Sequence, residues 1–194
     1  MSAPPGKAYA NQKGTHMAEP QLATFGAGCF WGTEAAVKKL PGILKTEVGF
    51  MGGTKEQPSY QDVIAHGTGH VEVVQVTFDP EQVSYDQLLQ LFWLVHNPTQ
   101  GNRQGNDVGD QYRSVIFYHS DEQQQEAEAS KAALADSGQY SEPITTGIEP
   151  ASTFWKAEDY HQDYLAKNPG GYCHVNMGKV NEFVATTFGD RHGL

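Results

Sequence analysis

Five short segments of the chain have the apolar or alternating pattern of β-strands. Each is bounded by Gly, Pro or Asp, which are common where strands end and turns begin. A sheet with an apolar face needs a second layer to cover it, so we expect helices packed against these strands. The predicted strands are Gln21–Gly26, Ile43–Phe50, His70–Phe78, Tyr112–His119 and Ile144–Ile148.

Three helices are predicted between these strands. Pro41-Gly42 would stop the first of them. The other two begin at Ser84 and Ser120, each followed three positions later by a glutamine. That spacing is typical of a capping box, in which the serine and the glutamine satisfy backbone amides at the helix start. The predicted helices run from Cys29 to about Leu40, over Tyr85–Val95, and from Ser120 to near Gly138.

The order of these elements predicts an α+β fold, a two-layer sandwich with helices on one face of a mixed sheet. Strand, helix and strand occur twice, followed by a helix and a last strand, which is the order of a ferredoxin-like split β-α-β core. Two stretches, Asn97–Gln111 and Asn168–Leu194, show no regular pattern. Long polar loops in a small domain are usually functional or disordered.

The first nineteen residues are polar and rich in Pro, Gly and Ala, and they lack the apolar segment of a secretory signal. Gly14-Thr15-His16-Met17 is typical of the junction left by an expression vector, and a native disordered leader is the alternative. We expect a cytoplasmic protein, where thiols stay reduced. The chain then divides into a leader (1–19), a catalytic domain (20–166) and a C-terminal tail (167–194).

The charge of the chain argues against two classes of partner. Its 194 residues include 23 acidic and 13 basic side chains, a formal net charge of −10. Such a field repels phosphate backbones and anionic lipid surfaces, so we expect neither nucleic acid nor membrane as a partner. No run approaches the ~18 apolar residues of a membrane span. A neutral substrate or a segment of another protein fits better.

Cys29 is the first candidate for chemistry. It stands where a predicted strand arrives, Gly28 permits a turn, and a helix leaves. Unpaired amides and the positive end of the helix dipole favour the thiolate there, and the thiolate is the reactive form. A small buried core cysteine is the alternative. The neighbouring Phe30 and Trp31 favour a reactive site.

Glu72 is the second candidate. Strand alternation places it on the same face as Val74, Val76 and Phe78. Among such neighbours its pKa would rise by desolvation, which would make it a general acid. A solvated glutamate at the strand end is the alternative that spacing alone leaves open.

The remaining polar residues predict a pocket and not a metal site. His66 and His70 lack the pattern of zinc ligands, and Cys173-His174 is too little for a tetrahedral site. We expect His96 and His161 to be structural hydrogen-bonding groups. A Gly-rich loop contributes Asp107 as part of a polar wall, and the apolar and hydroxyl parts would come from Phe30, Trp31, Tyr60 and Tyr112.

Four segments together resemble the A-type peptide methionine sulfoxide reductases, over about Ala23 to Cys173. Each segment is similar to a signature of that family, and they occur in the family's order. The segments are Gly28-Cys29-Phe30-Trp31-Gly32, Gly69-His70-Val71-Glu72, the stretch from Asn102 to Asp107 with Gln111-Tyr112-Arg113-Ser114, and Glu158-Asp159-Tyr160-His161-Gln162.

The resemblance implies how the chemistry is divided. Cys29 would attack the sulfoxide sulfur and become a sulfenic acid, with Glu72 as proton donor. Cys173 would resolve the sulfenic acid as a disulfide, which thioredoxin would reduce. The family acts on the S epimer of free and protein-bound methionine sulfoxide, without metal or organic cofactor.

The resemblance also implies the substrate-binding residues. Phe30 and Trp31 would form the apolar wall for the S-methyl group, and Tyr60 and Tyr112 would hydrogen-bond the oxygen. Asp107 would help to order the pocket through the polar loop.

The chain departs from the family pattern at two places. Asn97 stands where the family usually has Asp, which affects the electrostatics of the loop. Cys173 is the only recycling cysteine, so a second resolving step is absent.

Two other classes of function remain as alternatives. A cysteine hydrolase or acyl-transferase would need a histidine base near Cys29 and would not use Cys173. A non-catalytic peptide-binding module would use Phe30 and Trp31 and would have an inert Cys29 thiol.

Overall fold

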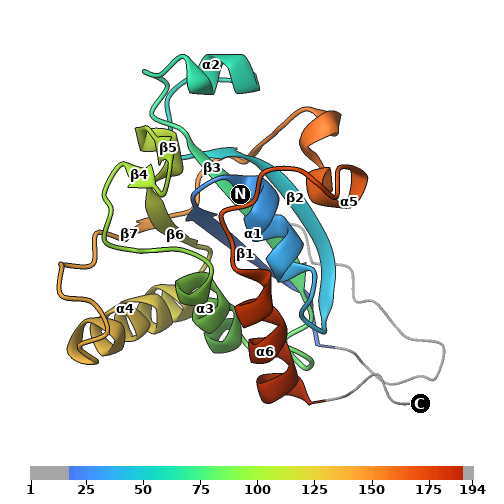
Figure 1. The fold of residues 1–194 in the computed structure, drawn as a ribbon, viewed down its shortest axis with the longest axis vertical. Helices are drawn as coiled ribbons and strands as arrows, with labels where there is room; N and C mark the ends of the chain where they lie inside the picture. Colours follow the sequence, from blue (N-terminus) through green and yellow to red (C-terminus); the bar gives the residue numbers. More distant parts are fainter. Residues whose placement is uncertain (1–17, 190–194) are drawn as a thin grey trace, which may run out of the picture.

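A six-stranded mixed sheet forms the centre of the structure, a computed structural model that describes residues 18–189 (Figure 1). Its strand order is β7-β6-β1-β3-β2-β8, with β6 and β7 parallel and all other pairs antiparallel. The strands are β1 (Gln21–Ala27), β2 (Ile43–Met51), β3 (Val71–Phe78), β6 (Ser114–Tyr118), β7 (Gly147–Pro150) and β8 (Trp155–Lys156).

The topology confirms the predicted α+β fold class. β1 and β2 are joined by α1 (Phe30–Val37) and run in the same direction, because β3 lies antiparallel between them. β3 and β6 are joined through α3 (Tyr85–Leu94) and enclose β1 in the same way. Two interleaved β-α-β units of this kind make a ferredoxin-like core.

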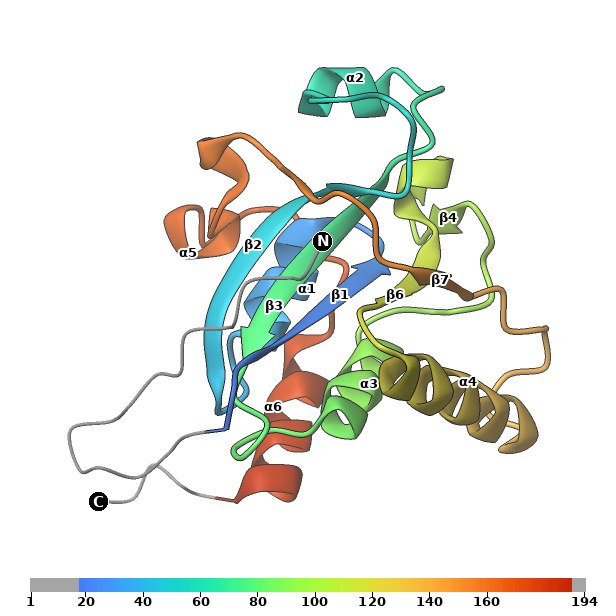
Figure 2. The same cartoon turned by 180° about the vertical axis from the view of Figure 1, so that it is seen from behind.

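The helices of the main layer pack on one face of the sheet. Helices α1 and α3, together with α4 (Asp121–Asp136) and α6 (Met177–Phe188), contribute buried side chains to the larger hydrophobic core. Figure 2, from the opposite side, shows β1, β2 and β3 in front of α1. A smaller cluster lies on the other face, made of Met51, Val71, Val73, Val115 and Phe117, with Ala151 and Phe154 packed against it.

Strand alternation sorts the side chains of β3 as predicted. Val74, Val76 and Phe78 belong to the larger core, whereas Val71 and Val73 belong to the smaller cluster. This is expected because successive side chains of a strand point to opposite faces. The side of β3 that carries Glu72 is therefore the side that faces α1.

Both predicted serine caps are present, but only one is a full capping box. Ser84 accepts from the Gln87 amide, and the Gln87 side chain returns to Ser84. Ser120 accepts from the Gln123 amide, but the Gln123 side chain contacts the backbone of His119 and Leu22 instead. Gln123 thus ties α4 to β1.

Several predicted boundaries were wrong by a few residues. α1 ends at Val37 and not at about Leu40. β6 begins at Ser114 because the preceding residues 110–112 form a 3-10 turn. β7 begins at Gly147 because the Thr145 amide donates to the Pro98 carbonyl, 2.8 Å away, and holds that segment to a loop.

Several short elements were not predicted. A hairpin of β4 (Arg103–Gln104) and β5 (Asp107–Val108) lies inside the loop 97–111. Helix α2 (Tyr60–Ile64) has a capping box of its own, and α5 (Tyr164–Lys167) follows a 3-10 turn at 159–161. The two-residue strand β8 was missed as well.

The segment 167–194 contains α6, which the sequence analysis did not predict. α6 packs against α3, with Val180 and Phe188 buried in the larger core. Its glycine and β-branched residues are weak helix formers, so tertiary burial supplies the stability that propensity lacks. The predicted leader falls mainly in residues 1–17, outside the described residues. None of the helices in residues 18–189 is long and apolar enough to cross a membrane.

Candidate active site

Cys29 is the N-cap residue of α1, directly after β1 and a glycine turn. Gly28 has a φ of +87°, a conformation that side chains rarely adopt, and a Cβ there would lie 2.7 Å from the Gln104 side chain. The chain can therefore make this turn only with glycine. The Cys29 side chain is buried, with 8% of its surface exposed.

The protonation state of Cys29 differs from the prediction. Burial raises the pKa of the thiol well above its usual range, and the negative charge of Glu72 raises it further. The Trp31 amide lowers the pKa but does not offset them. The helix dipole acts through the free amides of the first turn, and its effect on the pKa of Cys29 is smaller than that of desolvation. The prediction of a thiolate was therefore wrong for the free protein, in which Cys29 is a thiol.

Glu72 lies on β3 with its carboxyl directed at the start of α1. Its Oε1 accepts a hydrogen bond of 3.2 Å from the Phe30 amide. The side chain is 1% exposed, and Oε2 has no hydrogen-bond partner among the described residues. Burial raises the pKa of Glu72 to about 8, although the Phe30 amide opposes the shift. Glu72 is therefore largely protonated at neutral pH, and the solvated alternative was wrong.

Tyr60 and Tyr112 bring two hydroxyl groups to the same place. Burial raises the pKa of Tyr60 to about 12, and the charge that Glu72 carries once it is ionised raises it further. Burial, Glu72 and Tyr60 raise the pKa of Tyr112 in the same way. The Tyr60 ring packs against Phe30, the residue that follows Cys29, with ring centroids 6.5 Å apart. Both hydroxyls stay protonated near neutral pH and can donate hydrogen bonds.

An aromatic cluster forms around Phe30 and Trp31, the two residues that follow Cys29. Phe30 is buried and packs against Tyr60 and His161, with ring centroids 6.5 and 5.2 Å apart. The Trp31 indole stacks on Tyr164 at 3.7 Å and donates from Nε1 to Nδ1 of His161, 3.0 Å away. These contacts hold the indole in one orientation, as a wall for an apolar substrate group requires.

Asp107 lies in β5, and the Tyr172 hydroxyl donates to its Oδ2 at 3.0 Å. The hairpin that carries Asp107 is thus tied to the residue next to Cys173. Asn97, the position that departs from the family pattern, accepts at Oδ1 from both the amide and the hydroxyl of Thr99. An asparagine therefore orders this loop.

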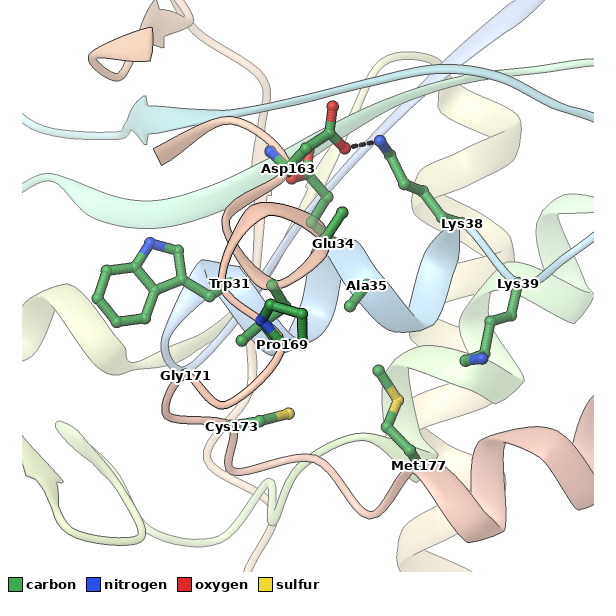
Figure 3. Close-up of a pocket in the computed structure, with 12 residues that line it drawn as sticks. Trp31, Glu34, Ala35, Lys38, Lys39, Asp163, Pro169, Gly171, Cys173 and Met177 are labelled. Atoms are coloured by element: carbon green, nitrogen blue, oxygen red, sulfur yellow. Dashed lines mark hydrogen bonds and ion pairs between the residues drawn. The ribbon is translucent and has the colours of Figure 1, made fainter. Parts of the chain in front are cut away.

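Cys173 lies beside the first turn of α1. Its Sγ makes a weak contact of 3.7 Å with the Val175 carbonyl, and both cysteines are free thiols. A cavity of about 500 Å³ adjoins it, and Figure 3 shows the sulfur directed into this space between Pro169 and Met177. Trp31 also lines the cavity.

His96 and His161, which were expected to be structural, are both buried and hydrogen-bonded. His96 is buried and bonds the Phe92 carbonyl and the Ser114 hydroxyl, each at 2.7 Å. His161, fully buried, accepts from Trp31. Within residues 18–189, no three His, Cys, Asp or Glu side chains gather in a way that could hold a metal ion.

Four residues of the site were not identified as such from the sequence. His161 was predicted only as a structural group, but it contacts three aromatic rings of the site. Glu158 accepts from the Tyr60 amide at 3.0 Å, and Tyr164 and Tyr172 support Trp31 and Asp107. His161 and Glu158 belong to the signature that begins at Glu158, which was the signal for them. Nothing in the local sequence pattern indicated Tyr164 or Tyr172.

The sequence of this chain matches one protein family and is similar to that of several known proteins. Residues 21–192 match the family described as peptide methionine sulfoxide reductase. A peptide methionine sulfoxide reductase MsrA of Methanoculleus marisnigri is 60% identical over 153 residues, which cover 79% of this chain and 93% of that protein. The MsrA of Geobacter sulfurreducens is 56% identical over 153 residues, 79% of this chain and 94% of the relative.

Solved structures show the same fold. Reduced Mxr1 from Saccharomyces cerevisiae has a TM-score of 0.77 and 34% identity, over 87% of this chain and 95% of that chain. Methionine sulfoxide reductase A of Corynebacterium diphtheriae has a TM-score of 0.71 and 38% identity, over 87% and 85% of the two chains. With a match across most of its length and relatives above half identity, this chain belongs to the peptide methionine sulfoxide reductase family.

Proposed function

We propose that the protein reduces methionine S-sulfoxide, free and in proteins, to methionine through a sulfenic acid on Cys29. The observation that carries this proposal is the placement of Glu72. It is a buried carboxyl with a pKa of about 8, bonded to the first amide of the helix that Cys29 caps. A thiol beside a neutral carboxylic acid in an aromatic pocket suits the reduction of a neutral sulfoxide.

In the first step, Cys29 attacks the sulfoxide sulfur. Glu72 donates its proton to the sulfoxide oxygen, and the thiol proton of Cys29 returns to the carboxylate. An S–S bond forms between the two sulfurs as the S–O bond breaks and the oxygen leaves as hydroxide. The hydroxide then attacks the Cys29 sulfur, the S–S bond breaks, and methionine leaves with the electron pair. The methionine sulfur has gained two electrons, the Cys29 sulfur has lost two, and Cys29 is a sulfenic acid. Because Cys29 is a thiol in the free protein, its deprotonation belongs to the reaction itself.

The surrounding residues hold the substrate. Tyr60 and Tyr112 donate to the sulfoxide oxygen, since both hydroxyls stay protonated. Phe30 and Trp31 contact the S-methyl group. Asp107 orders the hairpin that closes the polar side, through its bond with Tyr172.

In the second step, Cys173 resolves the sulfenic acid. Its thiol attacks the Cys29 sulfur, a disulfide forms, and the hydroxyl leaves as water with the thiol proton. Thioredoxin then reduces the disulfide by thiol exchange. A structure titled as Mxr1 in complex with Trx2 matches this chain with a TM-score of 0.53 and 25% identity. Two free thiols with these roles fit the reducing cytoplasm, which we propose as the compartment.

A cysteine hydrolase or acyl-transferase fits the site less well. That chemistry needs a histidine hydrogen-bonded to the nucleophile. Among residues 18–189, no histidine forms a hydrogen bond with Cys29, and the Nδ1 of the neighbouring His161 is engaged by Trp31. The carboxyl beside the thiol, Glu72, has a pKa of about 8 and is largely protonated at neutral pH, so it is poised to donate a proton rather than to act as the resting-state base of a hydrolase.

The test is turnover of the separate R and S epimers of a blocked methionine sulfoxide, with thioredoxin as reductant. We expect turnover of the S epimer alone and its complete loss in Cys29→Ser, because a hydroxyl cannot form the sulfenic intermediate. Circular dichroism would check that the variant is folded. Residual turnover above a few per cent of wild type would refute the role of Cys29.

A further inference from the structure

Gly32, in the first turn of α1, is where the helix meets the segment that carries Cys173. A Cβ added at Gly32 would lie 2.8 Å from the Cys173 Sγ and 3.0 Å from Val175 Cγ2. Non-bonded heavy atoms normally stay about 3.5–4.0 Å apart. Any side chain at position 32 would therefore push the Cys173 sulfur from its place.

The helix itself does not require glycine here. Gly32 lies inside α1 and does not have the positive φ that favours glycine, unlike Gly28. Alanine is a much better helix former than glycine in such a position. The reason for a glycine is therefore the tertiary contact and not the local backbone.

Gly32 follows Cys29 by three residues, so the two positions are neighbours on one face of the first turn. We propose that Gly32 is a positioning residue for the resolving step: its missing side chain is the space through which the Cys173 sulfur reaches the Cys29 sulfenic acid. This inference rests on the proposed function, because it takes Cys173 as the resolving thiol. The step is the one written above, a disulfide formed with loss of water.

The cavity beside Cys173 indicates what a methyl group at position 32 would do. The sulfur is directed into a space of about 500 Å³ between Pro169 and Met177 (Figure 3). A displaced sulfur can move into that space, and Val175 Cγ2, 3.0 Å from the added Cβ, needs to shift by only a few tenths of an ångström. Gly32→Ala should therefore fold, take oxygen from the substrate normally, and form the disulfide slowly.

The experiment measures both steps in one quenched-flow run without reductant. In Gly32→Ala, the burst of methionine should stay within about twofold of wild type. The rate of Cys29–Cys173 disulfide formation, followed by mass spectrometry, should fall by up to about 10²-fold, as expected for a misplacement of about 1 Å. Gly170→Ala is the matched control, because a Cβ there meets nothing within 4 Å and the residue lies in the same segment as Cys173. Its disulfide should form at the wild-type rate.

The possible outcomes separate this inference from the proposed function. Disulfide formation at the wild-type rate in Gly32→Ala, or an equal slowing of burst and disulfide, would overturn the role of Gly32. Absence of a burst in the wild type would overturn the proposed function instead. If Gly32→Ala does not fold, Gly32→Ala/Cys173→Ala should recover the melting temperature, since it lacks the sulfur. An equally unstable double variant would contradict the contact.

Discussion

At the scale of single residues, the site couples two groups that burial keeps neutral. Cys29 and Glu72 are both desolvated, and each would be less stable as an anion beside the other. A neutral pair of this kind can exchange protons during the reaction with little reorganisation of solvent. In the proposed mechanism, the tyrosine hydroxyls and the aromatic wall decide where the sulfoxide oxygen and the methyl group lie.

Glu72→Gln should slow the chemical step by roughly 10²–10⁴-fold, the usual range for a positioned general acid. The amide keeps the hydrogen bond from the Phe30 amide but cannot give up a proton at neutral pH. Single-turnover formation of methionine measures this step without the recycling reactions. An unchanged rate would show that the buried carboxyl has only a structural role.

Glu72 should also make the stability of the protein depend on pH. Its pKa rises from 4.5 to about 8 on folding, mainly through burial. The folded state then binds the proton more tightly, so the contribution of Glu72 to stability is full below about pH 4.5 and is lost as the pH rises through about 8. The melting temperature of Glu72→Gln, relative to wild type, should increase between about pH 4.5 and pH 8 and level off above pH 8.

At the scale of elements, short helices and turns place the reacting groups. α1 presents Cys29 at its N-terminus, α2 begins with Tyr60, and the β4–β5 hairpin carries Asp107. α2 has only five residues, so its position depends on its cap and on Glu158 more than on helix propensity.

Ser59→Ala should therefore affect both stability and activity. It removes the capping box that Ser59 makes with Asp62, worth about 1 kcal/mol of stability, and loosens the helix that begins with Tyr60. Ser84→Ala is a matched control, because it removes the same kind of capping box from α3, which carries none of the residues of the candidate site. Both variants should lose similar stability, and only Ser59→Ala should lower kcat/KM. An equal effect of both on kcat/KM would contradict a positioning role for α2.

At the scale of the whole molecule, the fold brings distant parts of the chain to one helix start. Cys29 follows the first strand, Glu72 lies on the third, and Cys173 precedes the last helix. α6 and Val175 anchor the segment behind Cys173 in the larger core, while Tyr172 ties the segment before it to Asp107. Cys173 is therefore presented by an ordered part of the fold.

Cys173→Ser should leave one turnover and abolish the rest with thioredoxin. In the proposed mechanism Cys29 alone takes the oxygen, so excess sulfoxide should still yield about one equivalent of methionine, and the sulfenic acid should be trapped by dimedone. Quenched-flow product counting and mass spectrometry measure both. Full thioredoxin-dependent turnover in this variant would mean that Cys173 takes no part.

The larger part of the fold could be predicted from the sequence, because it depends on patterns that act over a few residues. Alternation in β3, the serine caps of α3 and α4, and the glycine turn before Cys29 each require only local chemistry. The signatures around Cys29 and Glu72 indicated the family because each is a short run of consecutive residues that can be identified without the fold. Helix α6 and the hairpin around Asp107 were missed because their own patterns are weak and burial against other elements stabilises them.

Only the tertiary structure decided the protonation of the site and the approach of the second thiol. The dipole of a helix favours a thiolate, but the depth at which Cys29 is buried, and Glu72 across from it, reverse that preference. Likewise, no local rule distinguishes a glycine that the backbone requires from Gly32, whose missing side chain makes room for a sulfur from far along the chain. Burial and close approach are properties of the packed molecule. The sequence predicts them only where apolar residues repeat with the period of a strand or a helix.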